Sequence, residues 1–173
     1  MGGLLPLLSG GDRRSIGRAN EVAERVCAQP ELAKELADAL THDSDVVRMR
    51  AADALEKVAA SDAAAVRPFR GRLVSLATRT GQQELRWHLA QILPRLGLTA
   101  AERTRLVPVL RAWLADDSRI VQANALEALV VLALEDAALR PDVEKLVRAR
   151  AKDGPPSLQA RARRLARRLE MKD

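Results

Sequence analysis

The chain has 173 residues, of which 47% are hydrophobic and 30% charged, a globular balance that excludes an intrinsically disordered chain and suits one domain with a sizeable core. Its formal net charge is +6, and residues 140–173, with 11 Lys+Arg against 5 Asp+Glu, carry all of the excess. Cys27 is the single cysteine, which excludes an intrachain disulfide framework and predicts a reducing, cytoplasmic location.

Five segments follow one another along the chain with the same layout: an apolar helix, a turn and a second apolar helix. They cover about residues 3–28, 29–60, 64–97, 99–134 and 138–171. Their turns lie 32 to 38 residues apart and carry Gly11, Asp43, Gly81, Asp117 and Gly154. A period of this length with two helices per repeat is typical of an α-solenoid.

Each second helix has an apolar stripe that begins four residues after the turn residue, at Ser15, Val47, Leu85, Val121 and Leu158. Apolar residues recur at positions 4, 8 and 11 from these starting points, which is one face of a helix. Because they recur at three and four rather than at two, no strand is predicted. We therefore predict an all-α fold, an α-solenoid of about five helix pairs that forms a single domain over residues 1–173.

Several helix ends are marked in the sequence. Pro30 and Pro68 suit the first turn of a helix, because proline has no amide hydrogen to lose there. Pro94 should bend or end the second helix of the third repeat. Thr99 and Glu102 have the spacing of a capping box, which predicts a helix that starts directly after Thr99.

Two segments carry a resemblance to a known family. DVVRMRAADALEKVA (45–59) and SRIVQANALEALVVLA (118–133) resemble the second helices of HEAT repeats, which typically show an Asp turn, then Val-Arg, then Ala-rich core positions and a Leu. Gln122 and Gln159 stand where the pattern usually has Arg. The chain as a whole is similar to small stand-alone bacterial HEAT-repeat proteins. This resemblance implies an armadillo-like superhelix whose second helices line a concave surface.

We next ask which side chains of the second helices point away from the core. If the first stripe residue is position 0, positions 3, 6 and 10 are predicted to point outward, and position 2 lies on the boundary. Repeat five would then present Arg161, Arg164 and Arg168 with no partner on that stripe, either as a binding surface or as a solubilising cap. Trp87 would lean either into the core or into the groove. The predicted partner-binding residues are Met49, Arg50, Trp87, His88, Arg95, Arg161, Arg164 and Arg168.

Catalytic and metal-binding patterns are absent from the sequence. His42 and His88 lie in different repeats without further ligands at a suitable spacing, and Cys27 has no histidine near it in the sequence. We therefore expect no catalytic, cofactor-binding or metal-binding residues, and no enzyme. The start of the sequence, MGGLLPLLSGG, has no basic region, and its apolar run is too short for a signal peptide or a membrane span.

The predicted function is that of a non-catalytic interaction module or scaffold. Its concave surface would bind a peptide or a protein face, and the basic C-terminal repeat suits an acidic partner. The alternative is a nucleic-acid binder that contacts phosphates through Arg148, Arg150, Lys152, Arg161, Arg163, Arg164, Arg167 and Arg168. No membrane partner is expected, and the sequence leaves the oligomeric state open.

Overall fold

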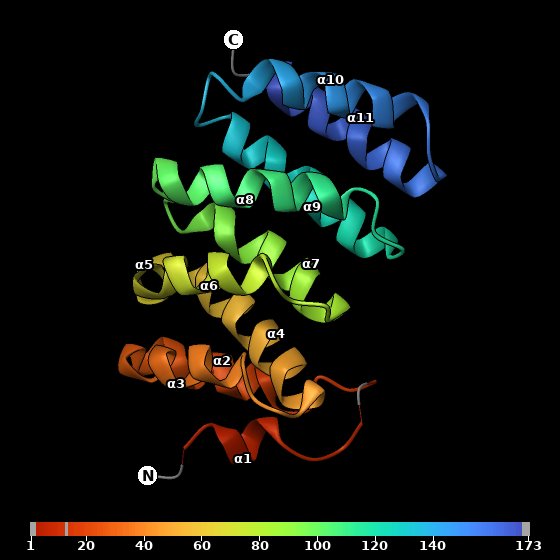
Figure 1. Cartoon of the computed structure of the whole chain (residues 1–173). Coiled ribbons are helices and arrows are strands. Elements are labelled where there is room, and N and C mark those ends of the chain that lie inside the picture. Colours follow the sequence, from red (N-terminus) through yellow and green to blue (C-terminus); the bar gives the residue numbers. More distant parts are fainter. Residues whose placement is uncertain (1–2, 13, 171–173) are drawn as a thin grey trace. The chain divides into compact units, whose positions relative to one another are not determined.

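The computed structural model describes residues 3–12 and 14–170, and within these ranges the chain forms helices and no strand (Figure 1). The predicted all-α fold is confirmed. The fifth predicted repeat runs to residue 171, which lies outside the described residues. The chain divides into two compact units, Met1–Leu98 and Thr99–Asp173. The division falls between the third and fourth predicted repeats, so each unit holds whole repeats.

The first unit is built around its longest helix, α4 (Asp45–Ser61), against which α2 (Ala19–Ala28) and α7 (Gln83–Ile92) both pack (Figure 1). These three are the second helices of repeats one to three. The remaining elements are α1 (Leu5–Leu8), η1 (Pro30–Leu32), α3 (Ala33–Ala39), α5 (Ala63–Val66), η2 (Arg67–Phe69), α6 (Arg70–Ala77) and η3 (Leu93–Arg95). The first repeat is thus the shortest, because α1 is a single helical turn.

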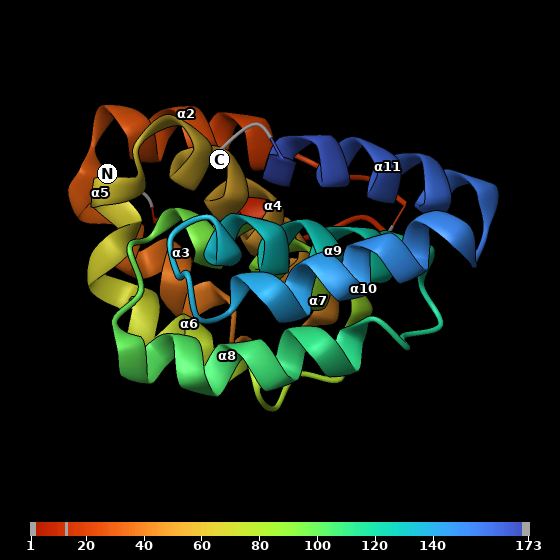
Figure 2. The ribbon, with the colours of Figure 1, turned by 90° about the horizontal axis from the view of Figure 1, so that it is seen from above.

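The second unit contains two complete helix pairs. The first pair is α8 (Ala100–Trp113) with α9 (Arg119–Ala133), and the second is α10 (Arg140–Lys152) with α11 (Pro156–Glu170). The helices α10 and α11 lie side by side (Figure 2), and α9 contacts both of them as well as α8. The helix α9 therefore occupies the centre of this unit, as α4 does in the first.

The apolar stripes form the core as predicted. In repeat two the side chains of Val47, Ala51, Leu55 and Val58 are buried, and the equivalent residues of repeats three and four are buried too. Repeat one departs from the register, because Ser15 is exposed and α2 starts only at Ala19. Many buried positions are alanines, whose small side chains let neighbouring helix backbones approach closely.

The predicted helix ends are confirmed. Pro30 and Pro68 each lie in the first turn of a short 3₁₀ helix. Thr99 and Glu102 form the capping box: the Thr99 side chain accepts a hydrogen bond from the amide of Glu102, and the Glu102 carboxylate accepts one from the amide of Thr99. The α-helical part of α7 stops at Ile92, directly before the 3₁₀ turn that contains Pro94.

One side chain closes the turn between the two helices in each of repeats two to five. This side chain is at position 1 of the second helix, and it donates to a main-chain carbonyl five or six residues earlier. Arg48 donates to the carbonyls of His42 and Asp43, at 2.7 and 2.8 Å. The corresponding pairs in the later repeats are Arg86 to Thr80 at 3.1 Å, Gln122 to Asp116 at 2.6 Å, and Gln159 to Gly154 at 2.9 Å. Gln122 and Gln159 therefore form the same hydrogen bond to the turn as the arginines at this position of repeats two and three.

The loop between α1 and α2 is held by the side chain of Arg50 on α4. Arg50 is only 3% exposed. Its guanidinium donates to the main-chain carbonyls of Leu8 at 3.1 Å, Ser9 at 3.2 Å, Asp12 at 3.3 Å and Ser15 at 3.1 Å, and also to that of Gly10. The prediction that Arg50 points outward is wrong, because its side chain reaches into the loop of the preceding repeat and satisfies carbonyls that no helix uses.

Replacing Arg50 with Met should lower the free energy of unfolding by about 2–4 kcal/mol, because one buried and four part-buried main-chain carbonyls lose their donor. The loop should also open to trypsin, which would then cleave faster after Arg14. Urea denaturation and a timed tryptic digest measure the two effects. The matched control is Arg18→Met, since Arg18 is exposed and its ion pair with Glu21 is local. Equal stability of the two variants would contradict the loop-holding role of Arg50.

Gly17 is the position of this loop that tolerates a side chain least. Its φ is +54°, and an added Cβ would lie 2.8 Å from Cζ of Arg50. We expect Gly17→Ala to destabilise the protein by about 1–3 kcal/mol. Gly10→Ala separates the two causes, since Gly10 has a φ of +76° but open space around it, and Gly81→Ala has neither problem. Thermal unfolding should rank the losses as Gly17, then Gly10, then Gly81.

Candidate functional site

In repeats two, three and five, position 3 of the second helix faces the preceding repeat instead of solvent, whereas Arg18 at this position of repeat one is exposed. In repeat two this residue is Arg50, and in repeat five it is Arg161, which donates to Asn124 and pairs with Glu127 of repeat four. In repeat three it is His88, which is only 8% exposed. Position 3 lies roughly a quarter turn from the centre of the apolar stripe, and in a stack of repeats the neighbouring helix covers that flank. The outward prediction for His88 is therefore also wrong.

The buried imidazole of His88 is neutral. Burial lowers its pKa to about 4; the nearby charges of Asp53 and Glu84 raise the pKa and that of Lys57 lowers it, and burial dominates. Its Nδ1 finds no hydrogen-bond partner among the described residues. Asp53 and Lys57 meanwhile pair with each other on α4. His88 is thus a packing residue, and its carboxylate neighbours are too weakly coupled to keep it charged.

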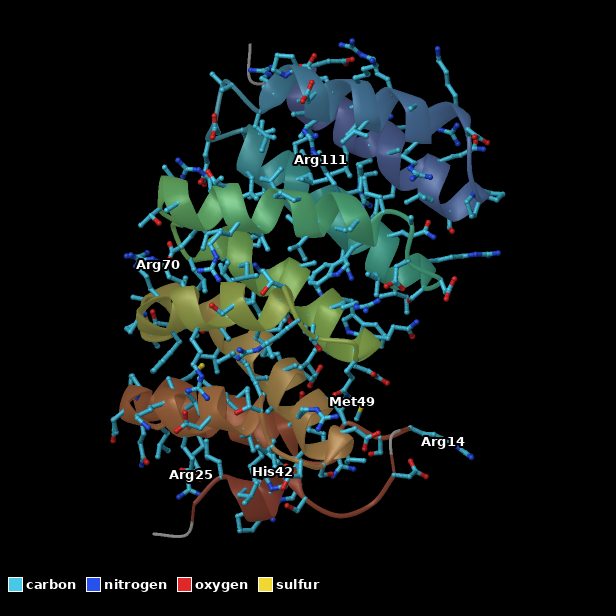
Figure 3. The ribbon with its side chains drawn as sticks, in the orientation of Figure 1. Arg14, Arg25, His42, Met49, Arg70 and Arg111 are labelled. Carbon is cyan, nitrogen blue, oxygen red and sulfur yellow. The ribbon has the colours of Figure 1, made fainter. Side chains whose placement is uncertain are left out.

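The other predicted residues of the first unit differ in accessibility. Met49 lies on α4 (Figure 3), and its side chain is buried, with 7% of the residue exposed. Trp87 is half-buried, and its ring lies 5.6 Å from that of His88 with a tilt of 54°. Arg95 is exposed and forms an ion pair of 2.9 Å with Glu56. Trp87 and Arg95 are consequently the members of this set that a partner could reach.

The arginine stripe of α11 has an internal counter-ion. Glu127 of α9 lies 3.2 Å from Arg161 and 3.9 Å from Arg168. The prediction considered partners on the stripe of α11 alone, and it did not anticipate this carboxylate, which comes from the preceding repeat. Arg164, between them, is exposed and forms no ion pair within the described part of the chain. Arg164 thus keeps its full capacity to bind an external anion.

A shallow hollow of about 420 Å³ lies between α9 and α11, beside this stripe. It is lined by Arg119, Ile120, Ala123, Ser157, Leu158, Ala160, Arg161 and Arg164. Three guanidinium groups and no carboxylate contribute to this lining. Its apolar part includes Ile120, which is 54% exposed and is the most exposed large hydrophobic residue among those described. The hollow therefore combines an unpartnered apolar side chain with an excess of positive charge.

The sequence analysis missed Arg119 and Ile120 because they precede position 0 of the stripe. They belong to the first turn of α9, just after the capping residue Ser118. The sequence does contain a signal for Ile120, which directly precedes the stripe residue Val121. At the equivalent position, repeats one, three and five have the polar residues Arg14, Glu84 and Ser157. An isoleucine that extends an apolar stripe onto its solvent side indicates an exposed apolar surface that a partner can cover.

The described residues contain no group of three or more His, Cys, Asp or Glu side chains that could hold a metal ion. None of the helices in the described part of the chain combines the length and the apolar character that crossing a bilayer requires.

The fold has close counterparts among solved structures. Comparison of the sequence with protein-family models and with curated proteins finds no match. The structure is similar to that of an engineered protein, with a TM-score of 0.65 and 20% identity over 98% of this chain and 78% of that one. It is also similar to computationally designed armadillo repeat proteins for modular peptide recognition, with a TM-score of 0.62 and 16% identity over 96% of this chain and 80% of that one.

These similarities show that the chain has an armadillo/HEAT-like helical repeat fold. The designed armadillo repeat proteins are described as made for modular peptide recognition. At this level of identity the likeness concerns the fold, so the partner of this chain has to be inferred from its own side chains.

The neutral state of His88 predicts a pH-dependent stability. The pKa is about 4 in the folded protein and about 6.5 in an unfolded chain, so the unfolded state binds more protons between these values. The contribution of His88 is complete above about pH 6.5 and is lost as the pH falls towards 4, with a total of at most about 3 kcal/mol. Unfolding free energies of the wild type and of His88→Gln at pH 7, 5.5 and 4.5 test this. The stability advantage of the wild type should shrink on acidification, and a constant difference would contradict it.

Proposed function

We propose that the chain is a non-catalytic protein-interaction module that binds an acidic peptide or protein segment in the hollow between α9 and α11. The observation that carries the proposal is the composition of this hollow, in which the exposed Ile120 lies among Arg119, Arg161 and Arg164. In HEAT-like arrays the second helices line the concave surface, and both walls of the hollow are second helices. We therefore assign the binding face to the concave side.

The side chains of the hollow suit two kinds of contact. The apolar floor, made by Ile120, Leu158 and neighbouring alanines, suits an apolar side chain of the partner. Arg119 and Arg164, which form no ion pair within the described residues, suit carboxylates, since a guanidinium binds a carboxylate with two parallel hydrogen bonds. Arg161 is already oriented by Asn124 and Glu127, so binding costs little additional ordering of that side chain.

Nucleic-acid binding is the alternative, and the structure weakens its basis. Several of the arginines counted towards a phosphate-binding surface are engaged within the protein. Arg148 pairs with Glu144 at 3.2 Å, Arg150 donates to the carbonyl of Leu114, and Arg163 donates to that of Ala151. No aromatic side chain lines the hollow, so bases would have no stacking platform there. An acidic protein segment fits these observations better.

The proposal can be tested with a charge-reversed variant, Arg119→Glu with Arg164→Glu. The probes are fluorescein-labelled 12-residue peptides in which one Leu or Phe is flanked by Asp and Glu, together with a 20-nucleotide single strand and its duplex. We expect peptide affinity to fall at least about tenfold in this variant, because both guanidinium contacts become repulsive. Fluorescence anisotropy at low and at physiological salt measures it.

The matched control is Arg163→Glu with Arg167→Glu. It changes the net charge of the protein by the same amount, but both substitutions lie on α11 and outside the hollow. It should bind the peptides nearly as well as the wild type, and all three proteins should melt within about 2 °C of one another because the altered residues are exposed. Equal losses in both variants would show that net charge alone is responsible. Tight, salt-sensitive binding of the oligonucleotides without peptide binding would favour the alternative function.

A further inference from the structure

A second hollow, of about 460 Å³, lies on the other pair of helices of the same unit, between α8 and α10. Its lining shares no residue with the hollow between α9 and α11. The residues that line it come from the C-terminal part of α8 with the turn after it and from most of the length of α10: Arg111, Leu114, Ala115, Asp142, Lys145, Leu146, Ala149 and Arg150. These are first helices, so this surface is separate from the face of the proposed function.

The groove exists because α8 and α10 each pack against α9 but scarcely against each other. Two contacts bridge them. Arg111, on the side of α8 that faces α10 (Figure 3), pairs with Asp142 at 3.1 Å, and Arg150 donates to the carbonyl of Leu114 at 3.1 Å. Ala115 and Ala149 contribute only methyl groups to the lining. The space between the helices thus has fixed walls and a floor of small apolar side chains.

The charges at the edge of this groove are unbalanced. Arg111, Lys145 and Arg150 contribute three positive charges, and Asp142 contributes one negative charge that Arg111 already neutralises. Arg150 is held by a carbonyl, which leaves its charge uncompensated at this contact. Lys145 is exposed and pairs with no carboxylate within the described ranges. The surplus of two positive charges around an apolar floor is complementary to a partner that is apolar on one side and acidic beside it.

The lining also indicates the conformation of the partner. An extended peptide exposes its own amides and needs side-chain acceptors for them, and Asp142, the one carboxylate or amide side chain in the lining, is already paired with Arg111. A helix satisfies its main chain internally and presents an apolar stripe at i, i+3, i+4 and i+7, which a groove between two helices can accept. The small side chains of Ala115 and Ala149 allow such a helix to approach closely.

We propose that the groove between α8 and α10 is a second docking surface, and that its partner is an amphipathic helix of another protein whose apolar stripe is flanked by Asp and Glu. This proposal does not rest on the function assigned to the hollow between α9 and α11. With both surfaces the chain is a two-sided scaffold, able to hold an acidic helix on its first helices while its second helices bind another segment.

The test uses a defined probe, a fluorescein-labelled 16-residue peptide held helical by a hydrocarbon staple, with Leu at i, i+3, i+4 and i+7 and Glu at the adjoining positions. Its scrambled counterpart has the same composition without the stripe. The groove variant is Lys145→Glu with Ala149→Glu, both at exposed positions of α10 where Glu is compatible with a helix. We expect the wild type to bind the striped peptide at least tenfold more tightly than the scrambled one, and the groove variant to lose at least tenfold in affinity.

Two control proteins give the experiment its specificity. Arg119→Glu with Arg164→Glu alters the other hollow, and Arg163→Glu with Arg167→Glu makes a larger change in net charge outside both. Both should keep the preference for the striped over the scrambled peptide, because any binding of these Leu- and Glu-containing probes in the other hollow does not require the stripe. Equal binding of the two peptides by the wild type, a preference that survives in the groove variant, or a preference that is lost in either control would overturn the proposal. Because the α9–α11 variant is read in the same assay, failure of this proposal and failure of the proposed function are distinguishable.

Discussion

The structure depends on the burial of one apolar stripe per second helix against both its own first helix and a neighbouring repeat. In each unit one such helix is central, α4 in the first and α9 in the second, and it is buried around most of its circumference. Leucine, alanine and valine supply nearly all of this packing, and the single phenylalanine, Phe69, is only half-buried. Cores built from small side chains require close helix contact, and close contact in turn determines which remaining side chains can reach solvent.

That constraint explains what could and could not be predicted from the sequence. The stripes, the capping box at Thr99 and the stop at Pro94 are local, and local periodicity was sufficient for them. The exposure of position 3 could not be predicted from local periodicity. A helical wheel distinguishes only a core side from a solvent side, whereas a helix in a stack of repeats has a third side, the flank that faces the preceding repeat. Arg50 and His88 were assigned to solvent for this reason. Sequence separation hides their partners, since the contacts of Arg50 lie 35 to 42 residues away.

The same reasoning applies to the basic C-terminal repeat. From the sequence its arginines form one charged stripe, whereas in the structure they differ in function. Arg161 and Arg168 share Glu127, Arg150 and Arg163 donate to carbonyls, and Arg164 stays without a counter-ion among the described residues. Glu127 and Glu144 therefore reduce the positive charge that a partner meets, whereas a carbonyl only orients Arg150 or Arg163 and leaves its charge in place. What distinguishes the hollow between α9 and α11 is the combination of free guanidinium groups with Ile120, which no count of charges reveals.

The closure of each inter-helix turn by Arg or Gln at position 1 has a consequence for how repeats can differ from one another. The turn carbonyl requires a donor of suitable reach and does not require a charge, because Gln122 and Gln159 make the bond as short as Arg86 does. Such bonds should be insensitive to ionic strength, unlike surface ion pairs. Position 1 is thus a place where a repeat can gain or lose a positive charge while its backbone geometry is conserved. Repeats that differ in net charge can in this way share one scaffold, and surface charge becomes a property that varies independently of the fold.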